Sequence, residues 1–415
     1  MVSSKKFQSL IAMVSLIIAG EMIFSLPFHI ARYFRPSFLS SYALSNTELG
    51  DIFFYYGITA FLGYFLGALI TDKFQPKTLI IISLVLTGTG GSVLLTDPSV
   101  TDLKILYSFW GLSTICLFWS PLIKSTRFIG GNRNQGTAFG FLDGGRGLCA
   151  AVVASLGVLF FSHNYIAELS EPYLSFQAIE QVIIFYIFMT FIAAFFVFLF
   201  LPTIANPATN NSISKLSERI QLLKKKIIWL QALIVASSYA CYKGLDHFSL
   251  YLYEVQNYSA QDSASIVAKI AYLRVIGATL AGLLSNRLQP SIVLILCFLF
   301  ISVNFFLIGL GTDNSHNITM ILVALCSSAL VVFGLRGVYF TLLSETKMPM
   351  AHTGFLVGLI SVIGFAPDIF FAPIAGRILD SFEGNTGHSF YFYFLGIISL
   401  IGFLASIMLN RQKLK

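Results

Sequence analysis

The longest polar connection in the chain reads ANPATNNSISKLSERIQLLKKK and covers residues 205–226. On both sides of it, apolar blocks alternate with short polar stretches. A membrane-spanning helix needs about 20 mostly apolar residues, and the blocks have about that length. The pattern therefore predicts transmembrane helices, six before this connection and six after it.

The composition agrees with this prediction. Of the 415 residues, 56% are hydrophobic and 11% are charged, whereas soluble domains carry about 25% charged residues. Because lipid offers no hydrogen-bond partners to the backbone, each span should be a helix. We expect an all-α membrane protein with twelve spans, at residues 7–30, 47–70, 78–95, 104–123, 137–161, 181–202, 227–253, 263–285, 289–310, 318–343, 352–379 and 389–410.

The long polar connection also sets the expected domains. They are two six-helix bundles, at 1–202 and 227–415, joined by a cytoplasmic linker at 203–226. The second half of the linker has helical apolar spacing and ends in three lysines, which favours a solvated helix near anionic lipid over a protein-binding site. The halves match weakly in three places, which predicts pseudo-repeats: TDKF (71–74) with SNRL (285–288), LIKSTR (122–127) with LLSETK (342–347), and GFLDG (140–144) with GFLVG (354–358).

The basic residues predict how the chain lies in the membrane. The net charge is +7, but the lysines and arginines gather in the tails and in loops on one side, which is typical of cytoplasmic loops and not of a nucleic-acid surface. Both termini are therefore expected in the cytoplasm. The first span lacks a small-residue cleavage site, so a cleaved signal peptide is not expected.

Cofactor chemistry has no signature in the sequence. The five cysteines all lie in apolar blocks, where they are expected to be small buried residues without disulfides. We find no nucleotide-binding loop, no metal-ligand spacing and no nucleophile–base motif. We therefore expect no cofactor, no metal and no enzymatic activity, and energy would come from an ion or solute gradient.

Span seven contains the densest polar cluster at mid-membrane depth, in YACYKGLDHFSLYLYE (239–254). Lys243, Asp246 and His247 are three and four residues apart and can share one helix face. With Tyr239 and Tyr242 nearby, they are predicted to bind substrate. The alternatives are a Lys–Asp pair that satisfies itself and a histidine that only packs.

Other ionisable residues stand inside predicted spans, where an unpaired charge costs about 2.5–3.5 kcal/mol. Arg336 in span ten is a further substrate-binding candidate. Glu21 in span one has no partner on its own helix, so it is a candidate for proton coupling; the alternative is a cross-helix ion pair with Lys243, Lys269 or Arg336. Asp368 follows Pro367 near an expected bend and could couple protons or cap the bend.

The stretch GFLDGGRGL (140–148) places Asp143 and Arg146 three residues apart on one face. We expect a structural ion pair between them, or a gate whose ion pairs re-form as the protein moves. The surrounding glycines should let another helix approach closely. A pocket, if present, should draw its rings from Tyr55, Tyr56, Trp119, Tyr239 and Tyr242.

The stretch GALITDKFQPK (67–77) resembles the cytoplasmic loop motif of the major facilitator superfamily. Asp72, Lys73 and Lys77 stand where that motif has its acid and bases, although Ala68 and Gln75 replace two of its glycines. In the second half Asn286 and Arg287 match in part, with asparagine for the acid. STRFIGGNRNQGTAFGFLDGGRG and YKGLDHFSLY further resemble the bacterial YihN-like group of this superfamily.

This resemblance implies a twelve-helix transporter fold in the bacterial inner membrane, with gating or structural roles for Asp72, Lys73 and Arg287. The group is distantly similar to organophosphate antiporters, which have basic residues at mid-membrane in spans one and seven. Here span seven has Lys243, but span one has the acid Glu21, so the resemblance does not extend to phosphate esters.

We therefore expect a monomeric secondary active transporter that moves a small polar solute by alternating access. The buried cations favour an anionic or zwitterionic organic solute. Protons or a counter-solute would be the coupled species. The chain is expected to contact membrane lipid and no nucleic acid. The alternative is a non-transporting sensor on the same fold, which would signal through residues 205–226 or the termini. A membrane enzyme is disfavoured because no catalytic constellation is evident.

Overall fold

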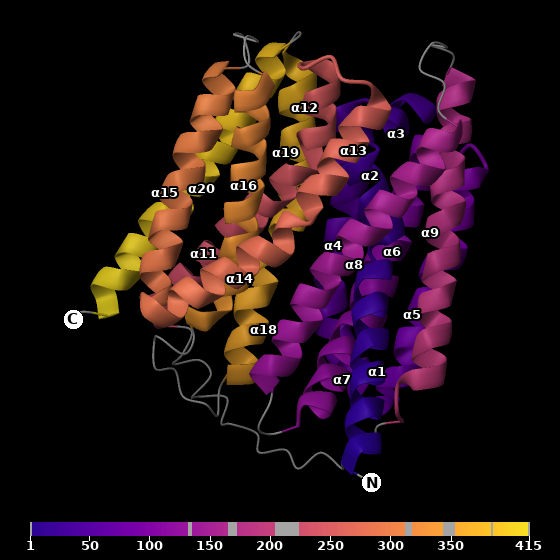
Figure 1. Cartoon of the computed structure of the whole chain (residues 1–415), viewed down its shortest axis with the longest axis vertical. Helices are drawn as coiled ribbons and strands as arrows, with labels where there is room; N and C mark the ends of the chain where they lie inside the picture. Colours follow the sequence, from indigo (N-terminus) through magenta and orange to yellow (C-terminus); the bar gives the residue numbers. More distant parts are fainter. Residues whose placement is uncertain are drawn as a thin grey trace.

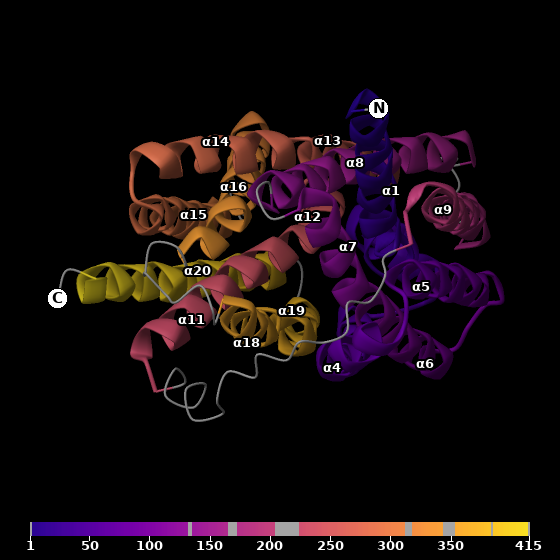
Figure 2. The same ribbon diagram turned by 90° about the horizontal axis from the view of Figure 1, so that it is seen from below.

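The computed structural model describes residues 2–131, 135–164, 172–203, 224–311, 318–342, 353–382 and 385–413, and within these ranges the regular structure is entirely helical. Long helices run side by side along the molecule, and both chain ends lie toward its lower end (Figure 1). Seen from below, the helices of the first half lie on one side and those of the second half on the other (Figure 2). The sequence-predicted linker falls mostly outside the described residues.

The described part of the first half contains twelve helical elements, several of which continue one another through short breaks. They are α1 (Val2–Met22), η1 (Ser25–His29), α2 (Ile30–Tyr33), α3 (Arg35–Ser41), α4 (Asn46–Lys73), α5 (Pro76–Gly91), η2 (Ser92–Leu95), α6 (Val100–Gly111), η3 (Leu112–Trp119), α7 (Ser120–Gly130), α8 (Gln135–Asn164) and α9 (Pro172–Phe200).

The described part of the second half also consists of helical elements, several of which continue one another through short breaks. Its elements are α11 (Lys226–Gly244), η4 (Leu245–His247), α12 (Phe248–Glu254), α13 (Ala260–Ala271), α14 (Leu273–Arg287), α15 (Pro290–Gly311), α16 (Ile318–Val338), η5 (Tyr339–Thr341), α18 (Thr353–Gly364), α19 (Pro367–Ser381) and α20 (Asn385–Lys413).

These elements confirm the predicted all-helical membrane fold. Within the described ranges, ten helices are long and apolar enough to cross a membrane, and the bent pair Phe7–Met22 and Ser25–Tyr33 makes an eleventh. The remaining predicted span, 227–253, corresponds to α11, η4 and α12, where Lys243 and Asp246 interrupt the apolar run. The bundle therefore has the expected twelve-helix arrangement.

Several spans are interrupted along their length, three of them beside Glu21, Asp246 and Asp368. The first span bends by 41° between Met22 and Ser25, and the π-helical turn η1 that follows contains Pro27, which has no backbone N–H to donate. In span seven, α11 ends at Gly244, and the 3₁₀ turn η4 that follows contains Asp246. In span eleven, α18 ends at Gly364 and α19 begins at Pro367, so the helix is broken just before Asp368.

Helices α4 and α19 join the two halves through an unusually close backbone contact. A Cβ atom added at Gly50 or Gly57 of α4 would collide with the backbone of Ala372 or Asp368 in α19. A Cβ at Gly376 of α19 would likewise collide with the backbone of Asn46. Small residues at these positions allow backbones to approach, as is common between membrane helices.

Polar contacts strengthen the same junction at the start of α4, near α3 and opposite the N-terminus (Figure 1). The Asp380 carboxylate of α19 accepts hydrogen bonds from the backbone N–H of Thr47 at 2.6 Å and from the Asn46 amide at 3.1 Å. Arg377 pairs with Asp51 at 2.8 Å. A carboxylate at a helix N-terminus also interacts favourably with the helix dipole, so this end of the junction is held by both packing and charge.

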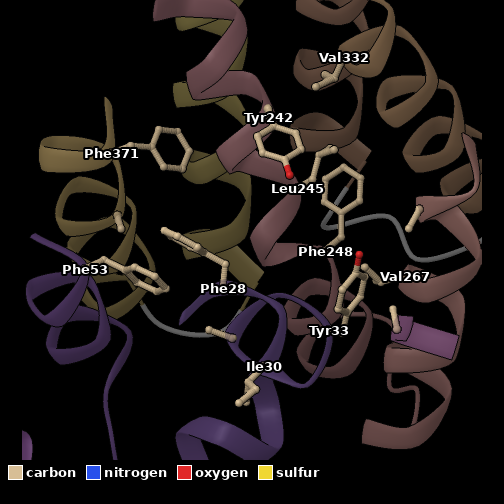
Figure 3. Close-up of a cluster of buried hydrophobic side chains, with 14 of the residues drawn as sticks. Phe28, Ile30, Tyr33, Phe53, Tyr242, Leu245, Phe248, Val267, Val332 and Phe371 are labelled. Atoms are coloured by element: carbon tan, nitrogen blue, oxygen red, sulfur yellow. The ribbon is translucent and has the colours of Figure 1, made fainter. Parts of the chain in front are cut away.

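The hydrophobic core continues across the junction between the halves. Figure 3 shows Phe28, Tyr33 and Phe53 of the first half packed near Tyr242, Leu245, Phe248, Val267, Val332 and Phe371 of the second. The rings of Phe28 and Phe53 stack with centroids 5.5 Å apart. The halves therefore share one core at mid-membrane, beside which the polar groups described below are set.

The close contact between α4 and α19 yields a stability prediction. Gly57→Leu places a side chain against the α19 backbone and should cost about 1–3 kcal/mol, the usual range for overpacking. The melting temperature of the purified protein in detergent should fall by several degrees. Gly140→Leu is the matched control, because no heavy atom lies within 4 Å of a Cβ added there. An equal loss in both variants would contradict the close packing of α4 on α19.

Candidate functional site

A cavity lies between the two halves at the level of the helix breaks. Its volume is about 80 Å³, smaller than the roughly 300–1,000 Å³ common for ligand pockets. Charged groups and aromatic rings line it together: Glu21, Phe24, Phe28, His29, Arg32, Tyr56, Tyr64, Ile115, Trp119, Arg146, Tyr239, Tyr242, Lys243, Arg274, Arg336, Phe365 and Asp368. Of the five rings expected at a pocket, Tyr56, Trp119, Tyr239 and Tyr242 are present, whereas Tyr55 is exposed and lies beside Lys104.

Lys243 is held between two carboxylates of its own half. Its Nζ lies 3.4 Å from Asp246 Oδ2 and 3.6 Å from Asp368 Oδ1. The ammonium also lies 4.1 Å from the centre of the Phe28 ring in the opposite half, which is cation–π distance. The Lys–Asp pair expected from their spacing is therefore present, and Asp368 adds a second anion.

Arg32 connects this group to the first half of the chain. Its Nε lies 2.5 Å from Asp246 Oδ1, and its Nη1 donates to the Tyr242 hydroxyl at 2.8 Å. The Ser249 hydroxyl donates to the Arg32 carbonyl at 2.9 Å. Sequence reasoning missed Arg32 because the predicted first span ended at residue 30, two residues before it. The continuation of this span through η1 and α2 brings Arg32 to the cavity and to Asp246.

Asp368 receives a further contact from the helix that carries Lys243. The Tyr239 hydroxyl donates to the two Asp368 carboxylate oxygens, at 2.9 and 3.1 Å. The break before Pro367 places Asp368 in the first turn of α19. The carboxylate thus lines the cavity while it is hydrogen-bonded on one side and paired with Lys243 on the other.

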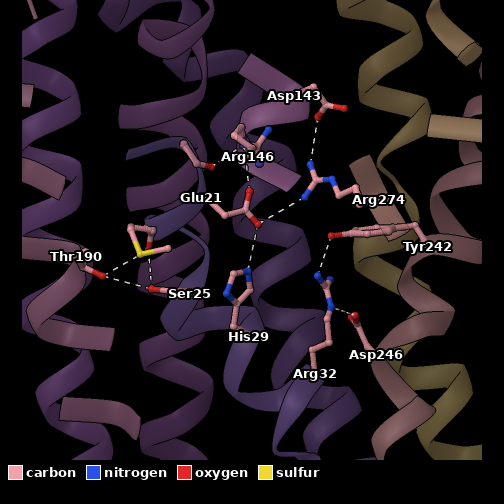
Figure 4. A network of polar contacts seen from close by, with 12 residues as sticks. Glu21, Ser25, His29, Arg32, Asp143, Arg146, Thr190, Tyr242, Asp246 and Arg274 are labelled. Atoms are coloured by element: carbon pink, nitrogen blue, oxygen red, sulfur yellow. Dashed lines mark hydrogen bonds and ion pairs between the residues drawn. The ribbon is translucent and has the colours of Figure 1, made fainter. Parts of the chain in front are cut away.

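Glu21 lies at the centre of a second charged group (Figure 4). Its Oε1 is 3.2 Å from His29 Nε2 and 3.6 Å from Arg274 Nη1, and its Oε2 is 3.3 Å from Arg146 Nε. Arg274 also contacts Asp143 Oδ1 at 3.1 Å. The alternative of a cross-helix ion pair for Glu21 is therefore correct in kind, but its partners are Arg146 and Arg274 instead of Lys243, Lys269 or Arg336.

The expected ion pair between Asp143 and Arg146 is wrong, because each side chain has another partner. Asp143 turns to Arg274 of the second half. Arg146 donates to the Gly20 carbonyl at 2.8 Å. In a regular α-helix the Phe24 N–H would donate to the Gly20 carbonyl. Here it donates to the backbone carbonyl of Glu21 instead, which leaves the Gly20 carbonyl available. The bend in the first span thus supplies Arg146 with a backbone acceptor beside the Glu21 carboxylate.

The glycines around Asp143 have mixed surroundings. Gly145 faces Ile17 of α1 and Gly147 faces the Arg274 side chain, and a Cβ at either would be crowded. Gly140 and Gly144 face open space within 4 Å. The prediction of close approach holds for the first two and is wrong for the last two.

Arg336 differs from the other cavity cations. Among the described residues, no carboxylate oxygen lies within 4.0 Å of its guanidinium nitrogens, the limit for an ion pair. Its guanidinium lies 3.9 Å from the centre of the Tyr242 ring and hydrogen-bonds Tyr339, an uncharged partner. Arg32 lies 4.7 Å from the centre of the same ring. Tyr242 therefore contacts two guanidinium groups, of which only Arg32 has a carboxylate partner.

The remaining predicted residues lie elsewhere. His247 is buried but is not part of the cavity wall; its Nδ1 is 3.0 Å from the Tyr391 hydroxyl. Lys73 and Arg287 are exposed at the ends of α4 and α14. The side chain of Asp72 falls outside the part of the chain that the structure describes. Within that part, no three His, Cys, Asp or Glu side chains are grouped to hold a metal ion, and the five cysteines are free.

The sequence is similar to known membrane proteins. The family model of the Major Facilitator Superfamily matches residues 9–372. Inner membrane protein YihN of Escherichia coli (strain K12) is 27% identical, with 99% of this chain and 96% of YihN covered. Inner membrane protein YqcE of the same strain is 25% identical, with 81% of this chain and 80% of YqcE covered.

Solved structures share the fold. A point mutant of the nucleoside transporter NupG superposes with a TM-score of 0.76 at 12% identity, covering 97% of this chain and 99% of that chain. A D-xylose–proton symporter gives a TM-score of 0.74 at 14% identity, covering 97% of both chains. The chain is thus a multi-pass membrane protein that shares its fold with solved transporters.

The partners of Arg274 yield a prediction about stability. Removing one member of a buried ion pair typically costs about 3–5 kcal/mol, because a charge is left without compensation. Arg274→Gln should lower the unfolding free energy by about that amount, measured by detergent-induced unfolding in mixed micelles. Adding Asp143→Asn to Arg274→Gln should recover part of the loss. A stronger coupling of Asp143→Asn with Arg146→Gln than with Arg274→Gln would contradict the pairing in the structure.

Proposed function

The chain belongs to the Major Facilitator Superfamily, and from this premise we propose that it is a secondary active transporter for a small anionic organic solute. The solute would bind in the cavity between the halves. Transporter sites commonly lie near the bilayer midplane, at the interface between repeated halves. The observation that carries the proposal is Arg336, a cavity arginine without a carboxylate partner among the described residues.

The cavity supports a solute with a polar and an apolar part. Arg336 offers a planar set of donors that suits a carboxylate or a similar anion. Aromatic rings from both halves, including Phe28, Tyr56 and Trp119, provide the apolar wall. Lys243, Tyr239 and Tyr242 would then contact the solute or hold its neighbours in place. Asp246 would act indirectly, through Arg32 and Lys243. His247 would stabilise the turn η4 through its contact with Tyr391, away from the cavity.

Alternating access would require the contacts between the halves to exchange. Arg32–Asp246 and Arg274–Glu21 both join the first half to the second beside the cavity. The α4–α19 junction closes the end opposite the N-terminus. We propose that this closed end faces outward and that both termini lie in the cytoplasm, as the loop lysines and arginines favour.

Proton coupling is better supported at Asp368 than at Glu21. Glu21 balances Arg146 and Arg274 at once, so protonating it would leave two buried arginines undercompensated. Asp368 shares Lys243 with Asp246, so Lys243 would keep a partner if Asp368 became neutral. Asp368 also lines the cavity directly. We therefore propose Asp368 as the coupling residue and Glu21 as a fixed counter-ion.

The test of function begins with a thermal-shift screen of small organic anions, followed by accumulation of the best binders in proteoliposomes. We expect at least one to accumulate in response to a pH gradient. Arg336→Gln should weaken its binding by about tenfold or more, since a hydrogen bond to a charged group contributes about 1.5–3 kcal/mol. Arg411→Gln, at the exposed end of α20, is the matched control. Unchanged affinity in Arg336→Gln would overturn the site, and binding without accumulation would favour a sensor.

The coupling residue has a separate test. Asp368→Asn should keep solute exchange between equal concentrations but lose accumulation driven by a pH gradient, because an amide cannot release a proton. Glu21→Gln should mainly reduce the amount of folded protein. Both exchange and accumulation can be followed in the same proteoliposomes with the solute found in the screen. Loss of accumulation in a well-folded Glu21→Gln variant, with accumulation retained in Asp368→Asn, would assign the coupling to Glu21 instead.

A further inference from the structure

We infer that the solute carries one net negative charge and no positively charged group. This inference rests on the proposed function and narrows it, because a small anion and a zwitterion both remained open from the sequence. The charges around the cavity support this inference. They fall into two groups in which carboxylates and cations lie within 4 Å of each other.

The first group of charges is neutral as a whole. Arg146 contacts Glu21, Glu21 contacts Arg274, and Arg274 contacts Asp143. Two cations thus alternate with two anions. His29 completes the group as a hydrogen-bond partner of Glu21 and is counted as a neutral imidazole. Both Glu21 oxygens lie beside cations, so Glu21 has little capacity left for a ligand cation.

The second group is neutral in the same way. Arg32 contacts Asp246, Asp246 contacts Lys243, and Lys243 contacts Asp368. Again two cations alternate with two anions. Asp368 also accepts the Tyr239 hydroxyl. No carboxylate in either group is without a cation, and these four are the described carboxylates that line the cavity or lie directly behind its cations.

Arg336 is the fifth cation and gives the site a net charge of +1 by this count. It contacts the face of Tyr242, and the Tyr242 hydroxyl is occupied by Arg32. Charged residues farther out do not alter the count. Arg35, for example, contacts Asn46, which in turn binds the Asp380 carboxylate, so that Arg35 and Asp380 offset each other away from the cavity.

Burial makes this count selective. Glu21, Lys243 and Arg274 beside the cavity are buried, and an uncompensated charge among buried charges is costly because the Coulomb energy of each unit charge is large there. A monoanion on Arg336 completes the neutralisation. A dianion would bring a surplus negative charge among four existing carboxylates. A zwitterion would bring an ammonium for which no free carboxylate remains, and a neutral solute would leave Arg336 uncompensated.

The test uses four three-carbon probes that differ mainly in charge and fit a small cavity: propionamide (neutral), propionate (one negative charge), malonate (two at a pH of about 7.5) and β-alanine (zwitterion). Binding to the full-length protein in detergent is measured by calorimetry at constant ionic strength. Propionate differs from each of the other probes by one charged group. We therefore expect propionate to bind about tenfold or more tightly than each of them. Equal or tighter binding of malonate, β-alanine or propionamide, or no binding of all four, would overturn the inference.

Two variants test the count itself. Asp368→Asn raises the net charge from +1 to +2 and should shift the preference from propionate toward malonate. Arg336→Gln lowers it to zero and should remove the advantage of propionate over propionamide, while Arg411→Gln should retain the wild-type order. An unchanged order of affinities in Asp368→Asn and Arg336→Gln would contradict the charge count. The wild-type series decides the question by itself if either variant fails to fold.

Failure of this inference can be distinguished from failure of the proposed function. A dianion or zwitterion that accumulates in proteoliposomes would overturn the charge match and leave transport in place. Binding in the predicted charge order, without accumulation of any solute in the screen, would support the charge match and contradict transport.

Discussion

The ion pair between Arg32 and Asp246 joins the two halves of the chain in the middle of the bundle, where a charge without a partner is most costly. The same constraint governs Glu21, Asp143, Arg146 and Arg274, and it explains why these charges lie in chains that alternate in sign. Neither half could bury its charges alone: Asp246 would lack Arg32, and Glu21 would lack Arg274. Charge compensation therefore draws the halves together at the cavity, and the shared aromatic core around Phe28 and Tyr242 follows from the same approach.

The helix breaks make this compensation geometrically feasible. The bend after Met22 frees the Gly20 carbonyl for Arg146, and the turn η1 carries Arg32 to the level of Asp246. The break before Pro367 places Asp368 beside Lys243. Irregular backbone at membrane depth is tolerated where it is buried in protein or lines a cavity, and here it does both. The glycines of α4 and α19 then set how closely the halves approach at the opposite end.

Much of the fold and part of the site could be predicted from the sequence. Length and hydropathy predicted the spans, because both depend on local composition. The cost of a charge inside a predicted span pointed to four residues that line the cavity: Glu21, Lys243, Arg336 and Asp368. Partners could not be predicted in the same way, because they lie on other helices: Asp143 pairs with Arg274 despite Arg146 three residues away. Arg32 was missed because a span of ordinary length ends before it, and His247, on the same expected face as Lys243, is turned away by the 3₁₀ geometry of η4.

The central claim is that, among the described residues, every cavity charge except that of Arg336 has a partner of opposite sign, and that Arg336 is left for the solute. An experimental structure with a solute from the anion screen bound in the cavity tests it most directly. The account predicts the anionic group against the Arg336 guanidinium, above the Tyr242 ring, with Arg32–Asp246 or Arg274–Asp143 still paired. An anionic group bound to other cations, with Arg336 paired to a protein carboxylate, would contradict it.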